Sequence, residues 1–164
     1  MTVQRALSRR NGFNGVASVV ALLMLACSAL SAAAGRVPAG FTEHFADVNG
    51  VILRYFIGGK GSPVVLLHGY AEISHMWIPL MPLLAKNHTV IVPDLRGAGD
   101  SSKPESGYDK KNMAVDIHEL VTSLGFNRVE VVGHDIGLMV ASSSKPSSWL
   151  RMCKARSSWV QAIG

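Results

Sequence analysis

Short apolar runs that end in polar, glycine-bearing loops constrain the fold of this chain more than any other feature. They span residues 63–67 and 89–92, and a third, strand-like run at residues 128–132 also holds Arg128 and Glu130. Such runs are typical of strands that are buried on both faces of a parallel sheet. Apolar side chains at helical spacing over residues 108–124, ending at Gly125, predict a helix between the second and third runs. Residues 76–86 are predicted to form only short helical turns, because Pro79 and Pro82 interrupt them.

The residues before the first run predict an antiparallel hairpin. Residues 41–48 and 51–57 alternate between apolar and polar, and Asn49-Gly50 between them is the strongest two-residue hairpin signal. Residues 58–62 form a glycine-rich turn that does not match a phosphate-binding loop. The expected fold class is therefore α/β, with an amino-terminal hairpin and a mostly parallel sheet covered by helices.

The net charge of +5 belongs to the ends of the chain. Residues 35–141 hold 9 basic and 11 acidic residues, a balance of −2. The basic excess therefore does not indicate a nucleic-acid-binding face, and no nucleic acid partner is expected.

The amino end has the pattern of an export signal. Three arginines, the last at Arg10, precede an apolar run over residues 16–25, and an alanine cleavage pattern ends before Gly35. The run is shorter than the roughly 20 residues that a membrane-spanning helix needs. Residues 1–34 are therefore predicted to be a signal peptide of an exported protein, periplasmic or secreted. A membrane anchor formed by residues 16–34 is the alternative.

The loop at residues 133–137 carries the strongest chemical signal. Gly133 and Gly137 flank Asp135 in the small-x-nucleophile-x-small form of a nucleophile elbow, a sharp turn from strand to helix. The loop follows a strand, and ligands of open α/β sheets bind at the carboxyl ends of the strands. Asp135 is therefore the candidate nucleophile. The alternative is that Asp135 only caps the following helix.

An aspartate nucleophile indicates a particular chemistry. A carboxylate that attacks a saturated carbon displaces an alkoxide or a halide and leaves an ester, whose carbonyl water can then attack. A serine in the same place would leave an ether, which has no carbonyl. Asp135 therefore indicates covalent cleavage of a C–O or C–halogen bond.

Residues 41–141 resemble the amino-terminal half of an α/β-hydrolase of the epoxide hydrolase and haloalkane dehalogenase branch. The resemblance lies in VVLLHG at residues 64–69, Trp77, VPDLRGAGDS at 92–101 and VVGHDIGLM at 131–139. It implies that the backbone N–H groups of Tyr70 and Ile136 form an oxyanion hole, with the Tyr70 ring as a pocket wall. It also implies that His68 and Gly69 support the loop after the apolar run at residues 63–67. It implies no cofactor and no metal.

Departures from the branch indicate the substrate class. Ile136 stands where haloalkane dehalogenases usually carry tryptophan. Fluoroacetate dehalogenases place arginines just after the nucleophile, whereas Ile136, Leu138 and Met139 are apolar here. A small, uncharged organic substrate is therefore expected, and an epoxide is favoured over a haloalkane or the substrate of another α/β-hydrolase. Ala71 stands where epoxide hydrolases often have proline.

Residues that the branch uses for turnover have no match in this sequence. Its general-base histidine and the acid partner follow later strands, and its ring-opening tyrosines lie in a cap domain. This sequence has no histidine after His134 and no tyrosine after Tyr108. We expect His134 to be a packed structural histidine and Arg96 to tie loops together through Asp94 or Asp100. The chain is thus predicted to be inactive as written, and a non-catalytic remnant or binding module is the alternative.

The composition changes after residue 141. Residues 142–164 hold seven serines, four basic residues and no acid. No strand is expected in this serine-rich basic tail. The α/β-hydrolase domain over residues 35–141 is therefore predicted to be partial, without later strands and cap, and the tail to be a truncated or frame-shifted ending.

Overall fold

The computed structural model describes residues 37–143 and 150–152 of the chain. The predicted signal peptide and most of the predicted serine-rich tail lie outside these residues. None of the helices in the described ranges is long and apolar enough to cross a membrane.

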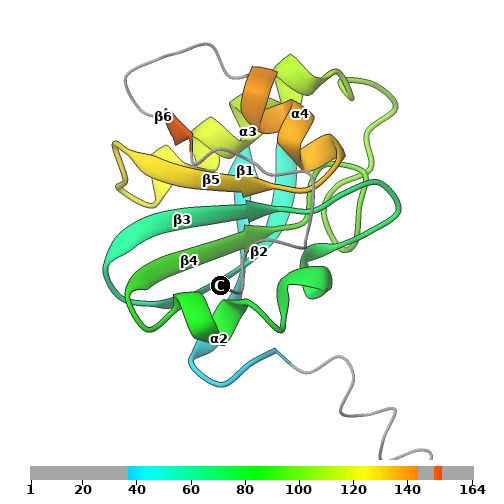
Figure 1. The fold of residues 1–164 in the computed structure, drawn as a ribbon. Coiled ribbons are helices and arrows are strands. Elements are labelled where there is room, and N and C mark those ends of the chain that lie inside the picture. Colours follow the sequence, from blue (N-terminus) through cyan, green and yellow to red (C-terminus); the bar gives the residue numbers. More distant parts are fainter. Residues whose placement is uncertain (1–36, 144–149, 153–164) are drawn as a thin grey trace, which may run out of the picture. The chain divides into compact units, whose positions relative to one another are not determined.

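A single mixed sheet organises the described residues (Figure 1). The first two strands form the predicted antiparallel hairpin, and β2 continues antiparallel against β4. The remaining neighbours are parallel, as the apolar runs predict. The spatial order is β1-β2-β4-β3-β5-β6. The strands are β1 (Phe41–Val48), β2 (Val51–Gly59), β3 (Ser62–Leu67), β4 (His88–Pro93), β5 (Val129–Gly133) and β6 (Leu150–Met152).

The last strand is a difference from the sequence prediction, which expects no strand after residue 141. Leu150–Met152 pairs in parallel with β5, with Leu150 opposite Val129 and Met152 opposite Val131. Pairing at a sheet edge uses backbone N–H and C=O groups, which every residue except proline carries in full. Three residues suffice for that pairing, whereas an apolar alternation needs a longer run to be recognised.

Within the described residues, four short or medium helices connect the strands: η1 (Ser74–Trp77), α2 (Met81–Leu84), α3 (Lys110–Ser123) and α4 (Ile136–Ser143). The two short ones, η1 and α2, confirm that the prolines limit this segment to short turns. The Asp109 side chain caps α3 by accepting a hydrogen bond from the Asn112 N–H at 2.9 Å. Gly125 follows the end of α3 with φ +82°, a conformation that favours glycine.

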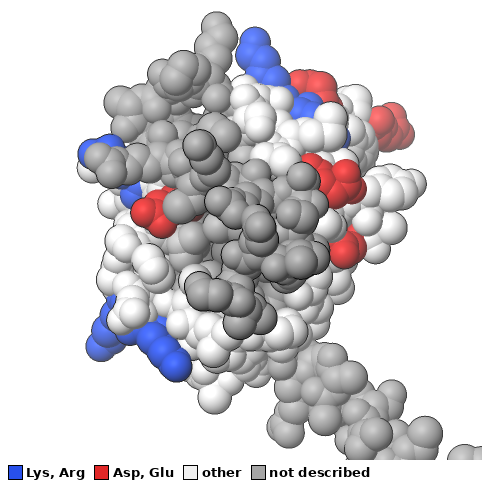
Figure 2. Space-filling view, viewed as in Figure 1, with Lys and Arg blue, Asp and Glu red and all other residues white. Residues whose placement is uncertain are grey.

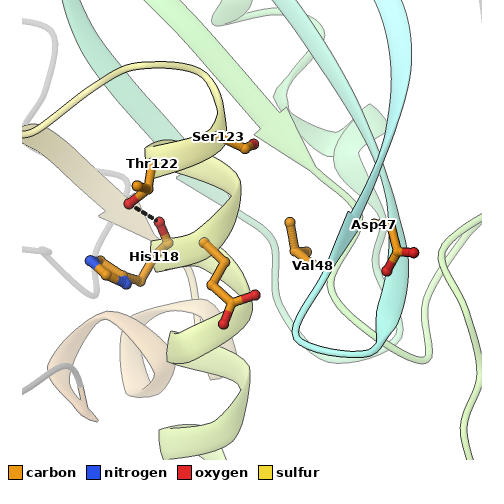
Figure 3. Close-up of a pocket in the computed structure, with 6 residues that line it drawn as sticks. Asp47, Val48, His118, Thr122 and Ser123 are labelled. Carbon is orange, nitrogen blue, oxygen red and sulfur yellow. Dashed lines mark hydrogen bonds between the residues drawn. The ribbon is translucent and has the colours of Figure 1, made fainter.

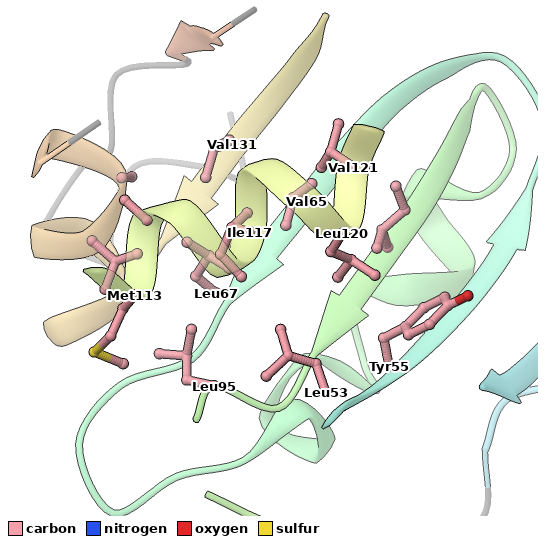
Figure 4. Packing of buried hydrophobic residues seen from close by; sticks show 14 of the residues in the cluster. Leu53, Tyr55, Val65, Leu67, Leu95, Met113, Ile117, Leu120, Val121 and Val131 are labelled. Carbon is pink, nitrogen blue, oxygen red and sulfur yellow. The ribbon is translucent and has the colours of Figure 1, made fainter. Parts of the chain in front are cut away.

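Buried side chains lie on both faces of β3, as its continuous apolar run predicts. Val65 and Leu67 pack in one cluster with Ile117 and Leu120 of α3 (Figure 4). Val64 and Leu66 belong to a second cluster, which includes residues of η1 and α2. Because successive side chains of a strand point to opposite faces, helices cover the sheet on two sides. The resulting scaffold holds the carboxyl ends of β3 and β5 side by side, with Leu67 opposite Gly133.

On the described part of the face drawn in Figure 2, acidic and basic residues occur in several separate places.

Candidate active site

Asp135 lies at a sharp turn between β5 and α4. Its φ angle is +47°, in the left-handed region that non-glycine residues enter only at a cost of roughly 1–3 kcal/mol. A Cβ atom on Gly133 would lie 2.5 Å from the Gly137 carbonyl carbon, and one on Gly137 would lie 2.7 Å from the His68 oxygen. Both positions therefore need glycine because backbones approach closely there. The turn presents the Asp135 side chain to solvent.

The loop after β3 contacts this turn directly. The Tyr70 N–H donates a hydrogen bond to Asp135 Oδ2 at 2.9 Å. Ile136 is the first residue of α4, so its N–H is one of the first four in the helix, which have no carbonyl partner within it. The Tyr70 side chain is 78% exposed. The structure thus brings the Tyr70 N–H to the Asp135 carboxylate and leaves the Tyr70 ring open to solvent, while Ile136 adjoins Asp135 only as its neighbour in the chain.

A tight turn over residues 69–72 aims the Tyr70 N–H. The Glu72 N–H donates to the Gly69 oxygen at 3.4 Å, which closes the turn. Ala71, its third residue, has φ +57°. Glycine is the residue that usually takes a positive φ at this position of a turn. Ala71 is therefore strained, and the proline that epoxide hydrolases often have here would not fit this backbone.

Substitutions of Ala71 test that strain. Ala71→Pro is expected to lower the free energy of unfolding by more than about 1 kcal/mol, because proline fixes φ near −65°. Ala71→Gly is the matched control and is expected to leave stability within about 1 kcal/mol of the parent, since glycine accepts a positive φ. Urea unfolding of the three proteins measures the difference. A proline variant as stable as the parent would show that the turn adopts another backbone.

His68 links this turn to the loop that follows β4. Its ring is buried, and Nε2 accepts a hydrogen bond from the Leu95 N–H at 2.9 Å. The hydrogen is therefore on Nδ1, which donates to the Gly69 oxygen at 2.9 Å. His68 thus holds the position of the Gly69–Tyr70 peptide group.

Glu72 and His134 lie beside the same turn, and sequence reasoning missed Glu72. Glu72 Oε2 accepts the Gly69 N–H at 3.0 Å and lies 3.9 Å from His134 Nε2. His134 is half-buried, with 35% of its side chain exposed, and its ring lies against Gly69. Glu72 stands three residues after Gly69, between the first apolar run and the turns predicted over residues 76–86, and its residue type alone gives no sign of this contact.

Arg96 binds a different partner from the one that the sequence suggests. Its Nε donates to Asp116 Oδ2 at 2.6 Å, and its Nη2 donates to Asp116 Oδ1. These hydrogen bonds raise the pKa of the Arg96 guanidinium. The expected pairing with Asp94 or Asp100 is wrong, because both acids face Arg54 instead. Asp116 is on the buried face of α3, where sequence spacing gives no sign of the contact.

Asp94 anchors the loop that follows β4. Its carboxylate is fully buried and accepts hydrogen bonds from the Ser74 N–H at 2.7 Å, Arg54 Nη1 at 3.0 Å and the Asp100 N–H at 3.2 Å. Burial alone would raise the pKa of Asp94, but the hydrogen bonds from Ser74, Arg54 and Asp100 bring it below its usual value. The carboxylate therefore stays ionised and ties β2, η1 and this loop together.

A shallow groove between β1 and α3 is separate from Asp135 (Figure 3). It is lined by Asp47, Val48, His118, Glu119, Thr122 and Ser123. None of them is a predicted site residue. Within the described ranges, no group of three or more His, Cys, Asp or Glu residues is arranged to hold a metal ion.

A family model and two curated relatives match this chain, and the family model covers the Asp135 elbow. The sequence model of a family described as alpha/beta hydrolase fold matches residues 62–142. Soluble epoxide hydrolase of Corynebacterium sp. (strain C12) is 50% identical over 100 residues, which are 61% of this chain and 35% of that protein. Fluoroacetate dehalogenase of Burkholderia sp. is 45% identical over 103 residues, covering 60% of this chain and 34% of that protein.

Solved structures agree with these relatives. The epoxide hydrolase CorEH without ligand superposes with a TM-score of 0.66 at 40% identity, covering 76% of this chain and 46% of that chain. The present chain spans about a third of the length of the curated relatives named above.

Proposed function

Because the chain belongs to the α/β-hydrolase superfamily, in the branch of epoxide hydrolases and dehalogenases, we propose that Asp135 is a nucleophile that opens an epoxide. One observation carries the proposal. Asp135 is held in a strained, exposed elbow while the Tyr70 N–H binds one of its two carboxylate oxygens at 2.9 Å. A helix cap needs no such contact from a second loop, so the arrangement favours the nucleophile over the capping role.

The proposed first step uses the other oxygen, Oδ1. It attacks a ring carbon of the epoxide, the bond from that carbon to the ring oxygen breaks, and the released oxygen takes a proton from solvent. The product is a hydroxyalkyl ester of Asp135.

In the second step water attacks Cγ of the ester, and negative charge develops on Oδ2. The Tyr70 N–H, already bonded to Oδ2, and the Ile136 N–H at the start of α4 would stabilise that charge. The step releases a diol and restores the carboxylate.

The first turn of α4 supports an uncharged, apolar substrate. Ile136 and Leu138 are partly buried and Met139 is 52% exposed, and α4 carries no charged side chain. No guanidinium on this helix is available to pair with a carboxylate substrate. A haloalkane fits the same chemistry and remains the lesser candidate.

We further propose that a polypeptide of these 164 residues, tested by itself, forms the ester but does not turn over. Hydrolysis of the ester needs a base that takes a proton from water, and in the branch this base is a histidine after a later strand. The sequence given has no histidine after His134. The ester at Asp135 is therefore expected to persist.

Mass spectrometry of the full chain tests the proposal. After incubation with a neutral aryl epoxide, the protein is expected to gain the mass of one epoxide, located on the peptide that contains Asp135. An epoxide that carries a carboxylate is the matched control for charge and should label more slowly, and a haloalkane tests the lesser candidate.

The alternative functions predict other outcomes. An absence of labelling by every electrophile would favour the non-catalytic binding module. Labels spread over several carboxylates would indicate unspecific alkylation and would contradict a nucleophile at Asp135.

We also propose that residues 1–34 direct export, with a membrane anchor over residues 16–34 as the alternative. The substrate is then a small molecule of the periplasm or the surroundings of the cell, and contact with a membrane is limited to the export signal.

A further inference from the structure

Gly69 is the point where the two loops of the site meet. A Cβ atom at this position would lie 2.6 Å from Glu72 Oε2, 2.9 Å from His134 Cδ2 and 3.2 Å from Asp135 Cβ. The absence of a side chain lets these three residues pack around one backbone unit. It also leaves Gly69 more conformational freedom than any other residue would have.

That freedom matters because the Gly69–Tyr70 peptide group carries the N–H that binds Asp135. The peptide group is planar, so its C=O and N–H point in opposite directions and turn together. The C=O accepts hydrogen bonds from His68 Nδ1 at 2.9 Å and from the Glu72 N–H at 3.4 Å. A rotation of this peptide group would move the Tyr70 N–H away from Asp135 Oδ2.

Glu72 holds the preceding peptide group as well. Its carboxylate accepts the Gly69 N–H at 3.0 Å, so backbone and side chain of Glu72 fix the peptide groups on both sides of Gly69. The same carboxylate oxygen lies 3.9 Å from His134 Nε2, next to Asp135 in the chain. Glu72 therefore joins the turn over residues 69–72 to the elbow that carries Asp135. The φ of +57° at Ala71 keeps the turn over residues 69–72 under strain.

We propose that Glu72 is a positioning residue, which holds the Tyr70 N–H on the carboxylate of Asp135. The proposal rests on the proposed function for its effect on ester formation, but the placement of the N–H is a separate property. Glu72 acts through the backbone and does not touch the substrate.

Three variants of the full chain separate the hydrogen bond from the charge. Glu72→Gln keeps an oxygen that can accept the Gly69 N–H, Glu72→Ala removes it, and Glu72→Asp withdraws it by one methylene group. Glu105→Ala, an exposed glutamate in another loop, is the matched control. Because the Glu72 side chain is 37% exposed, its loss is not expected to unfold the protein.

Amide hydrogen exchange measures the placement of the N–H without any substrate. The Tyr70 amide is expected to exchange at least about 10-fold faster in Glu72→Ala and Glu72→Asp, and at the parental rate in Glu72→Gln and Glu105→Ala. Amides of β3 should keep their protection in all variants, which a general loss of structure would not allow.

The rate of ester formation is the second measurement. It is expected to fall about 10- to 100-fold in Glu72→Ala, since displacement of a reacting group by about 1 Å costs up to 10²-fold, and to stay within about twofold in Glu72→Gln. If the parent forms no ester while the Tyr70 amide is deprotected in Glu72→Ala, the proposed function fails and the positioning role stands. Parental exchange in both Glu72→Ala and Glu72→Asp would overturn the positioning role. So would an equal loss of Tyr70 protection in Glu72→Gln.

Discussion

Replacing Asp135 by asparagine is expected to abolish ester formation, with labelling by a neutral epoxide falling at least about 10³-fold. A carboxamide oxygen is a far weaker nucleophile than a carboxylate, yet it can still accept the Tyr70 N–H. Asparagine also tolerates a positive φ, so the elbow and the stability of the fold should be retained. Peptide mass spectrometry after incubation with the epoxide measures the loss.

The control is Glu105→Gln, which removes an exposed carboxylate outside the site and should label like the parent. A label that stays at the parental level in Asp135→Asn, on any residue, would show that the reactive group is not Asp135.

Replacing Asp94 by alanine is expected to lower the free energy of unfolding by more than about 3 kcal/mol. The substitution removes the buried carboxylate that Arg54 Nη1 contacts at 3.0 Å and leaves the buried guanidinium only the more exposed Glu43 and Asp100. It also removes the acceptor of the Ser74 and Asp100 N–H groups. Removing one partner of a buried ion pair typically costs about 3–5 kcal/mol, a large part of the stability of most domains. Urea unfolding followed by circular dichroism measures the change.

Asp100→Ala is the matched control. The Asp100 carboxylate lies 3.5 Å from Arg54 Nε but its side chain is 68% exposed, so its loss should cost less than about 1 kcal/mol. Equal effects of the two substitutions would contradict the anchoring role of Asp94.

The buried carboxylate of Asp94 also predicts that the free energy of unfolding depends on pH. The pKa of Asp94 is lower in the folded protein than its usual value, which is about 3.9 in an unfolded chain. Its contribution to stability is therefore complete above about pH 4 and is lost as the pH falls through the folded pKa. The loss of stability between pH 5 and the acid limit should be smaller in Asp94→Ala than in the parent.

Features that depend on neighbouring residues could be predicted from the sequence. Asn49 and Gly50 have φ angles of +46° and +73°, the conformation that an Asn-Gly hairpin turn requires. The apolar run of β3 predicts burial on both faces, and the prolines limit η1 and α2. The Asp135 elbow belongs to the same class, because two glycines and one strained residue define it locally.

Contacts between distant residues could not be predicted in the same way. Arg96 had several acids within reach of its loop, and only the packing of α3 against that loop selects Asp116. Glu72 acquires its contacts through a turn in which Ala71 takes a positive φ, which its residue type does not favour. The pairing of β6 with β5 depends on a free backbone edge and not on a side-chain pattern.

The source of the oxygen in the first product molecule tests the role of Asp135 most directly. The full chain, in excess over a neutral epoxide, reacts in heavy-oxygen water, and any remaining ester is cleaved in the same water with mild base. The diol formed in a parallel reaction with Asp135→Asn is the background and is subtracted. If water attacks the ester carbonyl, the remaining diol contains no heavy oxygen, and the Asp135 carboxylate gains one heavy oxygen. A diol that carries the heavy oxygen while Asp135 stays unlabelled would show that water attacks the epoxide directly, and would contradict the covalent role of Asp135.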